Sequence, residues 1–213
     1  MAAQPTVIVL AAGKGSRFEG GGHKLAQPLG SSSVLLATLA AAIASHLRVV
    51  VVTTPAFVDV ARSSVAARDV VVLPEVGSAG DAGLGMGASI AAGVRACPDS
   101  GGWLVLPGDM PLVQPATLLA VARALDVHPV AYAQHLGRRG HPVGFAAELY
   151  SELTGLSGDE GARRLVVRYP AFAVERDDPG VLVDIDTAND LAAVRRDAEA
   201  LSLAEAQRAA LAP

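Results

Sequence analysis

The stretch VIVLAAGKGSR, from Val7 to Arg17, with Lys24 seven residues further on, decides the fold that the sequence predicts. The apolar run at its start is typical of a buried strand. The small residues that follow leave backbone N–H groups uncovered, so that a ligand can approach them directly. Ser16 adds a hydroxyl donor, while Arg17 and Lys24 add two cations near the same loop. Backbone donors combined with an arginine and a lysine indicate a binding loop for a polyphosphate.

Two common phosphate-binding patterns do not fit this loop. The dinucleotide fingerprint G-x-G-x-x-G fails because Phe18 stands at the third glycine, and residues 31–34 offer no acidic side chain for a ribose. The Walker pattern fails because Gly15 and Gly20 have the required spacing but Gly21 replaces the lysine. A nicotinamide-dependent dehydrogenase is therefore disfavoured. An ordinary glycine-rich turn between a strand and a helix is the alternative to a phosphate site.

Composition and charge narrow the class of protein. The chain has 213 residues, of which 51% are hydrophobic and 18% charged, and no apolar run reaches the ~18 residues of a membrane span. The first five residues carry no basic side chain, so no signal peptide is expected. Cys97 has no second cysteine to pair with, which suits a reducing cytoplasm. The net charge of −4 argues against a nucleic-acid surface. We expect a cytoplasmic protein that binds neither nucleic acid nor membrane.

Apolar runs alternate with helical patterns along the rest of the chain. Further strands are predicted at residues 48–52, 70–73, 103–106 and 130–133, and helices at residues 33–46, 55–66, 90–95 and 115–125. This alternation predicts a Rossmann-like three-layer α/β/α fold around a mainly parallel, mixed sheet. The loops that follow the parallel strands should meet at one edge of the sheet, where such folds bind ligands. We expect a single domain over residues 1–213, with a C-terminal helical extension from about residue 191.

Two later loops carry further candidate residues. Residues 74–89 contain five glycines and lead into a predicted helix, so their backbone N–H groups could meet an anion or a base; the alternative is a flexible surface loop. Asp109 follows the predicted strand at residues 103–106 within PGDMPL. A carboxylate at that edge of the sheet, beside a phosphate loop, suits Mg²⁺. The alternative is a turn in which Asp109 caps the next helix.

These motifs resemble those of the MobA-like nucleotidyltransferases, which use NTPs to complete molybdenum cofactors, and of relatives that activate sugars and polyols. LAAGKGSR at residues 10–17, followed by Lys24, is similar to the opening signature L-A-[AG]-G-x-x-[ST]-R-[MF]…K of the family, with a longer insert before the lysine. GDMP at residues 108–111 resembles the G-D-[MQ]-P motif, whose aspartate binds metal. GMGASI at residues 85–90 resembles G-M-S-S-S-L, but two serines are replaced by glycine and alanine.

The resemblance continues through three later segments. RRGHPVGF at residues 138–145 and GDEGARR at residues 158–164 are similar to family segments near the acceptor. DIDTANDL at residues 184–191 matches D-[IV]-D-T-x-x-D-L, in which the aspartate before threonine can join the metal site. Each segment also has a plainer interpretation. RRGHPVGF could be a solvated hairpin tip with a structural histidine, GDEGARR could carry acidic residues because they are favoured at the start of a helix, and DIDTANDL could form a capping box.

The resemblance implies an Mg²⁺-dependent nucleotidyltransferase that transfers an NMP to a phosphorylated acceptor and releases pyrophosphate. CTP is expected rather than GTP, because cytidylyltransferase members tend to read L-A-A-G where guanylyltransferases read L-A-G-G. Molybdopterin is the expected acceptor, and a molybdoenzyme or its chaperone is a candidate protein partner. The expected catalytic residues are Arg17, Lys24 and Asp109. The expected nucleotide-binding residues are Leu10, Ala11, Ala12, Gly13, Gly15, Ser16, Arg17, Lys24, Gly85, Met86, Ser89 and Gly108. The expected metal ligands are Asp109 and Asp186, and the expected acceptor-binding residues are Arg139, His141 and Arg163.

Three alternatives remain open from the sequence. A guanylyltransferase and a sugar- or polyol-phosphate nucleotidyltransferase would use the same chemistry on other substrates. A nucleotide-binding module without turnover is a different class of protein, favoured by the loss of two serines at Gly87 and Ala88 and by the long insert before Lys24. Release of pyrophosphate separates the enzymes from the binding module.

Overall fold

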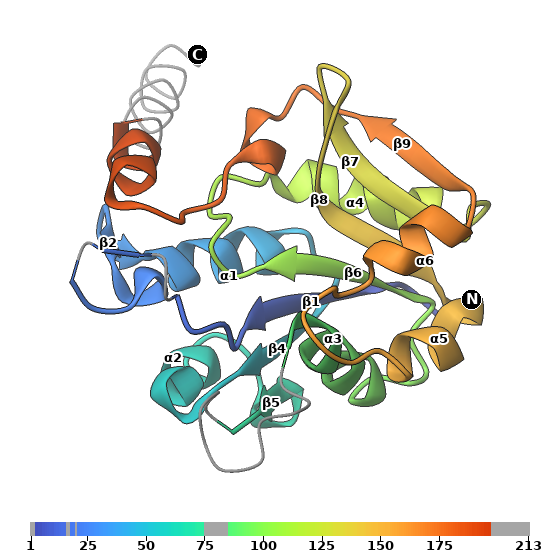
Figure 1. Cartoon of the computed structure of the whole chain (residues 1–213), viewed down its shortest axis with the longest axis horizontal. Helices are drawn as coiled ribbons and strands as arrows, with labels where there is room; N and C mark the ends of the chain where they lie inside the picture. Colours follow the sequence, from blue (N-terminus) through green and yellow to red (C-terminus); the bar gives the residue numbers. More distant parts are fainter. Residues whose placement is uncertain (1–2, 16–17, 20, 75–84, 197–213) are drawn as a thin grey trace, which may run out of the picture.

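A seven-stranded sheet with helices on both faces forms the centre of the computed structural model (Figure 1). The structure describes residues 3–15, 18–19, 21–74 and 85–196. The strand order is β5 (Val70–Val72), β4 (Arg48–Thr53), β1 (Thr6–Ala11), β6 (Gly102–Pro107), β8 (Arg138–Ala146), β7 (Val130–His135) and β9 (Ala171–Glu175). Among these strands only β8 runs against the others, pairing antiparallel with both β6 and β7. The predicted Rossmann-like α/β fold with a mainly parallel, mixed sheet is confirmed.

Two hydrophobic clusters fill the space between the sheet and its helices. One lies against α1 (Val34–Ala44) and α4 (Pro115–Ala124), and the other against α3 (Met86–Arg95), α5 (Tyr150–Thr154) and α6 (Arg163–Arg168). Alternate residues of β1 face the two sides: Val7 and Val9 belong to the first cluster and Ile8 to the second. This period of two explains why β1 reads as a continuous apolar run, since a strand in the middle of such a sheet is buried on both faces.

Short elements complete the fold. The remaining helices and turns are η1 (Lys24–Ala26), η2 (Pro55–Phe57), α2 (Val58–Arg62), η3 (Ala67–Asp69), η4 (Ala147–Leu149) and η5 (Pro179–Leu182), and β2 (Pro28–Leu29) pairs antiparallel with β3 (Ser32–Ser33). A further helix covers residues 188–196. The predicted extension beyond it, residues 197–213, lies outside the described residues. No helix in the described part of the chain has the length and apolarity that crossing a bilayer requires.

The structure departs from the sequence prediction at residues 55–66. A single helix was expected there, but η2 and α2 share the segment and α2 ends at Arg62. The hydroxyl of Ser63 donates to the carbonyl of Val60 at 2.8 Å, and Ser64 donates its backbone N–H to Ala61 in a turn. Serine competes in this way with the helical hydrogen bonds of the backbone, which accounts for the early end.

Candidate active site

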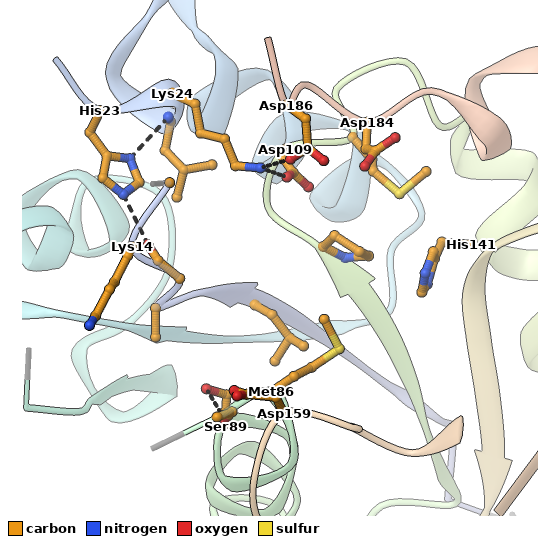
Figure 2. A pocket seen from close by; sticks show the side chains of 18 of the residues that line it. Lys14, His23, Lys24, Met86, Ser89, Asp109, His141, Asp159, Asp184 and Asp186 are labelled. Carbon is orange, nitrogen blue, oxygen red and sulfur yellow. Dashed lines mark hydrogen bonds and ion pairs between the residues drawn. The ribbon is translucent and has the colours of Figure 1, made fainter. Parts of the chain in front are cut away.

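A pocket of about 750 Å³ opens at the edge of the sheet where β1 and β6 end and β8 begins. Its wall is built by the loop after β1, by η1, by the start of α3, by the start of β8 and by residues 181–186 (Figure 2). This edge is the one that the sequence pattern assigned to ligands. Elements far apart in the chain therefore meet around one cavity.

The loop after β1 lines the pocket through Gly13, Lys14 and Gly15. Gly15 has a φ of +61°, the left-handed conformation that glycine adopts without strain. This turn exposes the loop backbone toward the cavity, as a phosphate-binding loop requires. Ser16 and Arg17, which were expected to contact a triphosphate, lie outside the described residues, and their roles remain predictions.

A lysine and two aspartates form the charged centre of the pocket (Figure 2). Lys24 Nζ lies 2.5 Å from Asp109 Oδ2 and 2.7 Å from Asp186 Oδ1. The Lys24 and Asp109 side chains are each 13% exposed and that of Asp186 is 23% exposed, so water screens these ion pairs only in part. Burial opposes the charged form of Lys24, but its hydrogen bonds to Asp109 and Asp186 outweigh burial, and the pKa of Lys24 is raised. Lys24 is thus a permanent cation.

Asp109 is held in place by backbone contacts on both sides. The N–H of Gly108 donates to the carbonyl of Leu10 at 2.9 Å, and the hydroxyl of Thr38 lies 3.0 Å from the carbonyl of Gly108. The carbonyl of Asp109 accepts from the N–H of Ile185 at 3.2 Å, which brings the segment carrying Asp186 alongside. A side chain at position 108 would lie 2.9 Å from the Leu10 oxygen, so glycine is needed there. These contacts fix the carboxylate at the end of the buried strand.

The capping box expected in the DIDTANDL segment is present, and it is formed by Thr187 and Asp190. Asp190 Oδ2 accepts from the backbone N–H groups of Asp186 and Thr187 and from the Thr187 hydroxyl, at 3.2, 2.7 and 2.8 Å. The helix at residues 188–196 is therefore capped by Thr187 and Asp190. The Asp186 carboxylate is left to face Lys24 in the pocket.

The charges of the pocket suit a divalent cation bound together with a substrate. Asp109 and Asp186 converge on one point, and Asp109 Oδ1 is buried without a hydrogen-bond partner within the described residues. Burial, and after it the neighbouring charges of Asp186 and Asp109, raises the pKa of Asp184. No group of three or more histidine, cysteine, aspartate or glutamate side chains suited to a metal occurs in the described ranges. The residues fit Mg²⁺, which commonly takes one or two carboxylates and completes its shell with phosphates and water.

The predicted acceptor residues divide into two sets. Arg139 and His141 line the pocket, and the guanidinium of Arg139 lies over the Tyr132 ring at 4.9 Å. His141 Nδ1 is buried with no partner in the part of the chain that is described, and burial lowers the pKa of His141, so the imidazole is neutral near pH 7. Arg163 lies instead on a shallow groove along α6. Burial lowers the pKa of Arg139, and the positive charge of Arg163 adds to this effect to a smaller extent.

Tight packing between chain segments explains the glycines at the start of α3. A side chain at Gly85 would lie 2.2 Å from the backbone of Gly158, and one at Gly87 would lie 2.7 Å from the carbonyl oxygen of Ser157. The N–H of Gly87 donates to the carbonyl of Gly158 at 2.9 Å. A serine at position 87 has no room, so the departure from the family pattern at Gly87 has a steric cause.

Of the predicted nucleotide-binding residues that the structure describes, most border the pocket and two do not. Those bordering the pocket are Leu10, Ala12, Gly13, Gly15, Lys24, Gly85, Met86 and Ser89. Ala11 and Gly108 are buried beneath the pocket wall, where they support the site rather than line it. Sequence reasoning missed His23, Asp184 and Asp159, which also border the pocket. Asp184 stands in the same motif as Asp186, so its position was the available signal.

Comparisons with known proteins agree with this geometry. Residues 7–174 match the model of the MobA-like NTP transferase domain. Purine catabolism protein PucB of Bacillus subtilis (strain 168) is 34% identical over 204 residues, covering 89% of this chain and 95% of that protein. The structure of Rv0371C from Mycobacterium tuberculosis in complex with manganese has a TM-score of 0.75 at 27% identity, covering 92% and 100% of the two chains. A nucleotidyl transferase from Methanothermobacter thermautotroptrophicus (Mth528) has a TM-score of 0.75 at 26% identity, covering 93% and 99%. The chain therefore belongs to the family of MobA-like NTP transferases.

Proposed function

We propose that this nucleotidyltransferase-family chain uses Mg²⁺ to transfer CMP from CTP to a phosphorylated acceptor, molybdopterin being the best candidate, and releases pyrophosphate. The observation that carries the proposal is the meeting of Lys24, Asp109 and Asp186 beside a glycine-rich loop. A cation and two carboxylates at a phosphate loop are the groups that a triphosphate and its metal ion need. The manganese complex of Rv0371C supports a divalent cation at this fold.

In the proposed reaction a phosphate oxygen of the acceptor attacks the α-phosphorus of CTP. The bond from the α-phosphorus to its bridging oxygen breaks, and pyrophosphate leaves with that oxygen. Asp109 and Asp186 would hold Mg²⁺, which when bound neutralises charge on the phosphates. Lys24 and the N–H groups of the loop at residues 13–15 would hold the triphosphate. No general base is needed, because the acceptor phosphate is already an anion, so alignment and charge neutralisation carry the catalysis.

Arg139 supports the assignment of an acceptor subsite on the β8 side of the pocket. It is positively charged, borders the cavity and is held over the Tyr132 ring. Neutral His141 beside it can exchange a hydrogen bond with a polar group of the acceptor. An extended acceptor entering from this side would reach the carboxylate centre with its phosphate.

Pyrophosphate release from each NTP, with Mg²⁺ and molybdopterin, tests the proposal. Asp109→Asn keeps the shape of the side chain and removes its charge, and it should lower turnover at least ~100-fold, as does the loss of other electrostatic stabilisers. Asp59→Asn on the exposed face of α2 is the matched control and should keep full activity. CTP at 100 times its Kd adds ~2.7 kcal/mol of stability, a rise in Tm of roughly 5–11 °C. CTP binding with no release of pyrophosphate, whichever acceptor is supplied, would favour the binding module instead.

A further inference from the structure

His23 joins the phosphate loop to the turn that carries Lys24. Its Nε2 lies 3.0 Å from the carbonyl oxygen of Gly13, and its Nδ1 lies 3.2 Å from the backbone nitrogen of Leu25 (Figure 2). A backbone N–H only donates and a carbonyl only accepts. These two contacts therefore assign Nδ1 as the acceptor from Leu25 and Nε2 as the donor to Gly13.

The ring is also packed from two other sides. Phe57, a buried residue of η2, meets it edge to face with the ring centres 4.6 Å apart. Gly15 lies so close that a side chain there would sit 3.3 Å from Nε2. The imidazole thus has one orientation, set by contacts from three separate segments. A glycine at position 15 is what allows the loop to lie against it.

Both ring nitrogens are used by the protein backbone. Although His23 borders the pocket, it has no polar atom left for a ligand. Direct catalysis or substrate binding by this side chain is therefore disfavoured. Its contacts instead fix the distance between the loop at residues 13–15 and Lys24, which follows directly in the sequence.

We infer that His23 is a positioning residue for the triphosphate: it holds the phosphate loop at the spacing from Lys24 that a bound triphosphate requires. This inference rests on the proposed function, because it assigns the loop to the phosphates of an NTP. The hydrogen bond from Nε2 to Gly13 is the part that acts on the loop. The cap on Leu25 serves only the start of η1.

Two substitutions separate the two hydrogen bonds of the ring. In His23→Gln the side-chain amide nitrogen can take the place of Nε2 and donate to Gly13. In His23→Asn the side-chain oxygen can take the place of Nδ1 and accept from Leu25, but nothing reaches Gly13. The two variants are similar in size and polarity and both avoid an empty space, so both are expected to fold.

The affinity for CTP and CMP with Mg²⁺, measured by calorimetry, is the primary readout. His23→Asn should weaken CTP binding about 3- to 10-fold, the range for one lost hydrogen bond, and weaken CMP binding much less. His23→Gln should remain within about twofold of the native protein. His46→Asn, an exposed histidine after α1 with a positive φ that asparagine tolerates, is the control and should change neither affinity.

Three results would overturn the inference. The first is native CTP affinity in folded His23→Asn. The second is an equal loss for CTP and CMP, which would indicate a general structural role. The third is a loss in His23→Gln with none in His23→Asn, which would assign the effect to the cap. Failure of the native protein to bind any NTP would instead refute the proposed function, so the two failures are distinguishable.

Discussion

The ammonium group of Lys24 lies between the two carboxylates that are proposed to hold the metal ion. A metal ion that binds without substrate would therefore need the place that Lys24 occupies. Its ammonium makes two charged contacts, at 2.5 and 2.7 Å, with Asp109 and Asp186. A metal entering alone must displace both contacts, whereas a metal entering with a triphosphate offers Lys24 new anionic partners. Lys24→Met keeps the length of the side chain and removes its charge. We expect this variant to bind Mn²⁺ more tightly without nucleotide and to lose transfer activity.

The size of the effect follows from the two contacts. A hydrogen bond to a charged group contributes ~1.5–3 kcal/mol, so displacing two costs roughly 3–6 kcal/mol. Since 1.4 kcal/mol is a factor of ten, the uncompensated loss of both contacts would correspond to at least ~100-fold in metal affinity. The displaced ammonium regains water, which reduces the effect, so we expect Mn²⁺ to bind Lys24→Met at least ~10-fold more tightly than the native protein.

Mn²⁺ affinity can be measured by titration with detection of free ion by electron paramagnetic resonance. Lys14→Met is the matched control, since it removes the same charge from the same pocket and makes no described contact with Asp109 or Asp186. It should leave Mn²⁺ affinity within about twofold. The double variant Lys24→Met/Asp109→Asn should lose the gain, because one of the two proposed metal ligands is then missing. Unchanged or weaker Mn²⁺ binding in Lys24→Met would refute the reasoning.

Four further predictions concern the walls of the pocket. Ala12 borders the pocket, and we propose that its methyl group narrows the base site; kcat/KM for CTP should then exceed that for GTP by about 5- to 150-fold, the effect of ~1–3 kcal/mol, and Ala12→Gly should reduce this preference. Arg139→Gln should raise the acceptor KM about 10- to 150-fold with the NTP KM nearly constant. Arg163 lies outside the pocket wall, so Arg163→Gln should raise the acceptor KM less in the same kinetic assay. The lowered pKa of His141 means that the folded state disfavours its protonation. The free energy of unfolding should therefore be fully retained above the ordinary pKa of 6.5 and should fall as the pH drops below it. Between pH 7.5 and 5, Tm should fall less in His141→Gln than in the native protein. Gly87→Ser would force a side chain to within 2.7 Å of a neighbouring carbonyl, and chemical denaturation should show a loss of ~1–3 kcal/mol.

The parallel half of the sheet was predictable because its strands are buried on both faces. Continuous apolar runs at β1, β4 and β6 mark such strands without any knowledge of their neighbours. Strand β8 gave no such signal, because Gly140, Pro142 and Gly144 interrupt it. The pairing of β7 with β8 shifts register between Tyr132 and Gln134, which leaves Pro142 opposite an irregularity in the ladder. Proline is tolerated at such a position, but only the paired structure reveals the irregularity.

The residue patterns alone predicted the charged centre of the site only as separate parts, and it was the family resemblance that grouped Asp109 with Asp186. Asp109 stood out because it ends a buried strand, and Lys24 because it follows a glycine-rich loop. The contact of Lys24 with Asp186 joins residues 162 positions apart, and no local pattern reports such a contact. The histidine beside Lys24 offered even less, since its role depends on the Gly13 carbonyl and the Phe57 ring. Sequence patterns indicate where helices and strands end, but contacts between these elements can be identified only once the fold is known.

The glycines at the start of α3 show how a local pattern can mislead. Against the family pattern, Gly87 reads as the loss of a hydroxyl from a nucleotide-binding segment. In the structure the space of that side chain is filled by the backbone at Ser157, and the N–H of Gly87 is bonded to Gly158. The segment that supplies this backbone continues to Asp159, which borders the pocket. Loss of the hydroxyl is thus coupled to the close approach of a second segment, and both form one wall of the cavity. The absence of a side chain at Gly87 therefore has a packing reason in this fold, and it gives no independent reason to expect a protein without turnover.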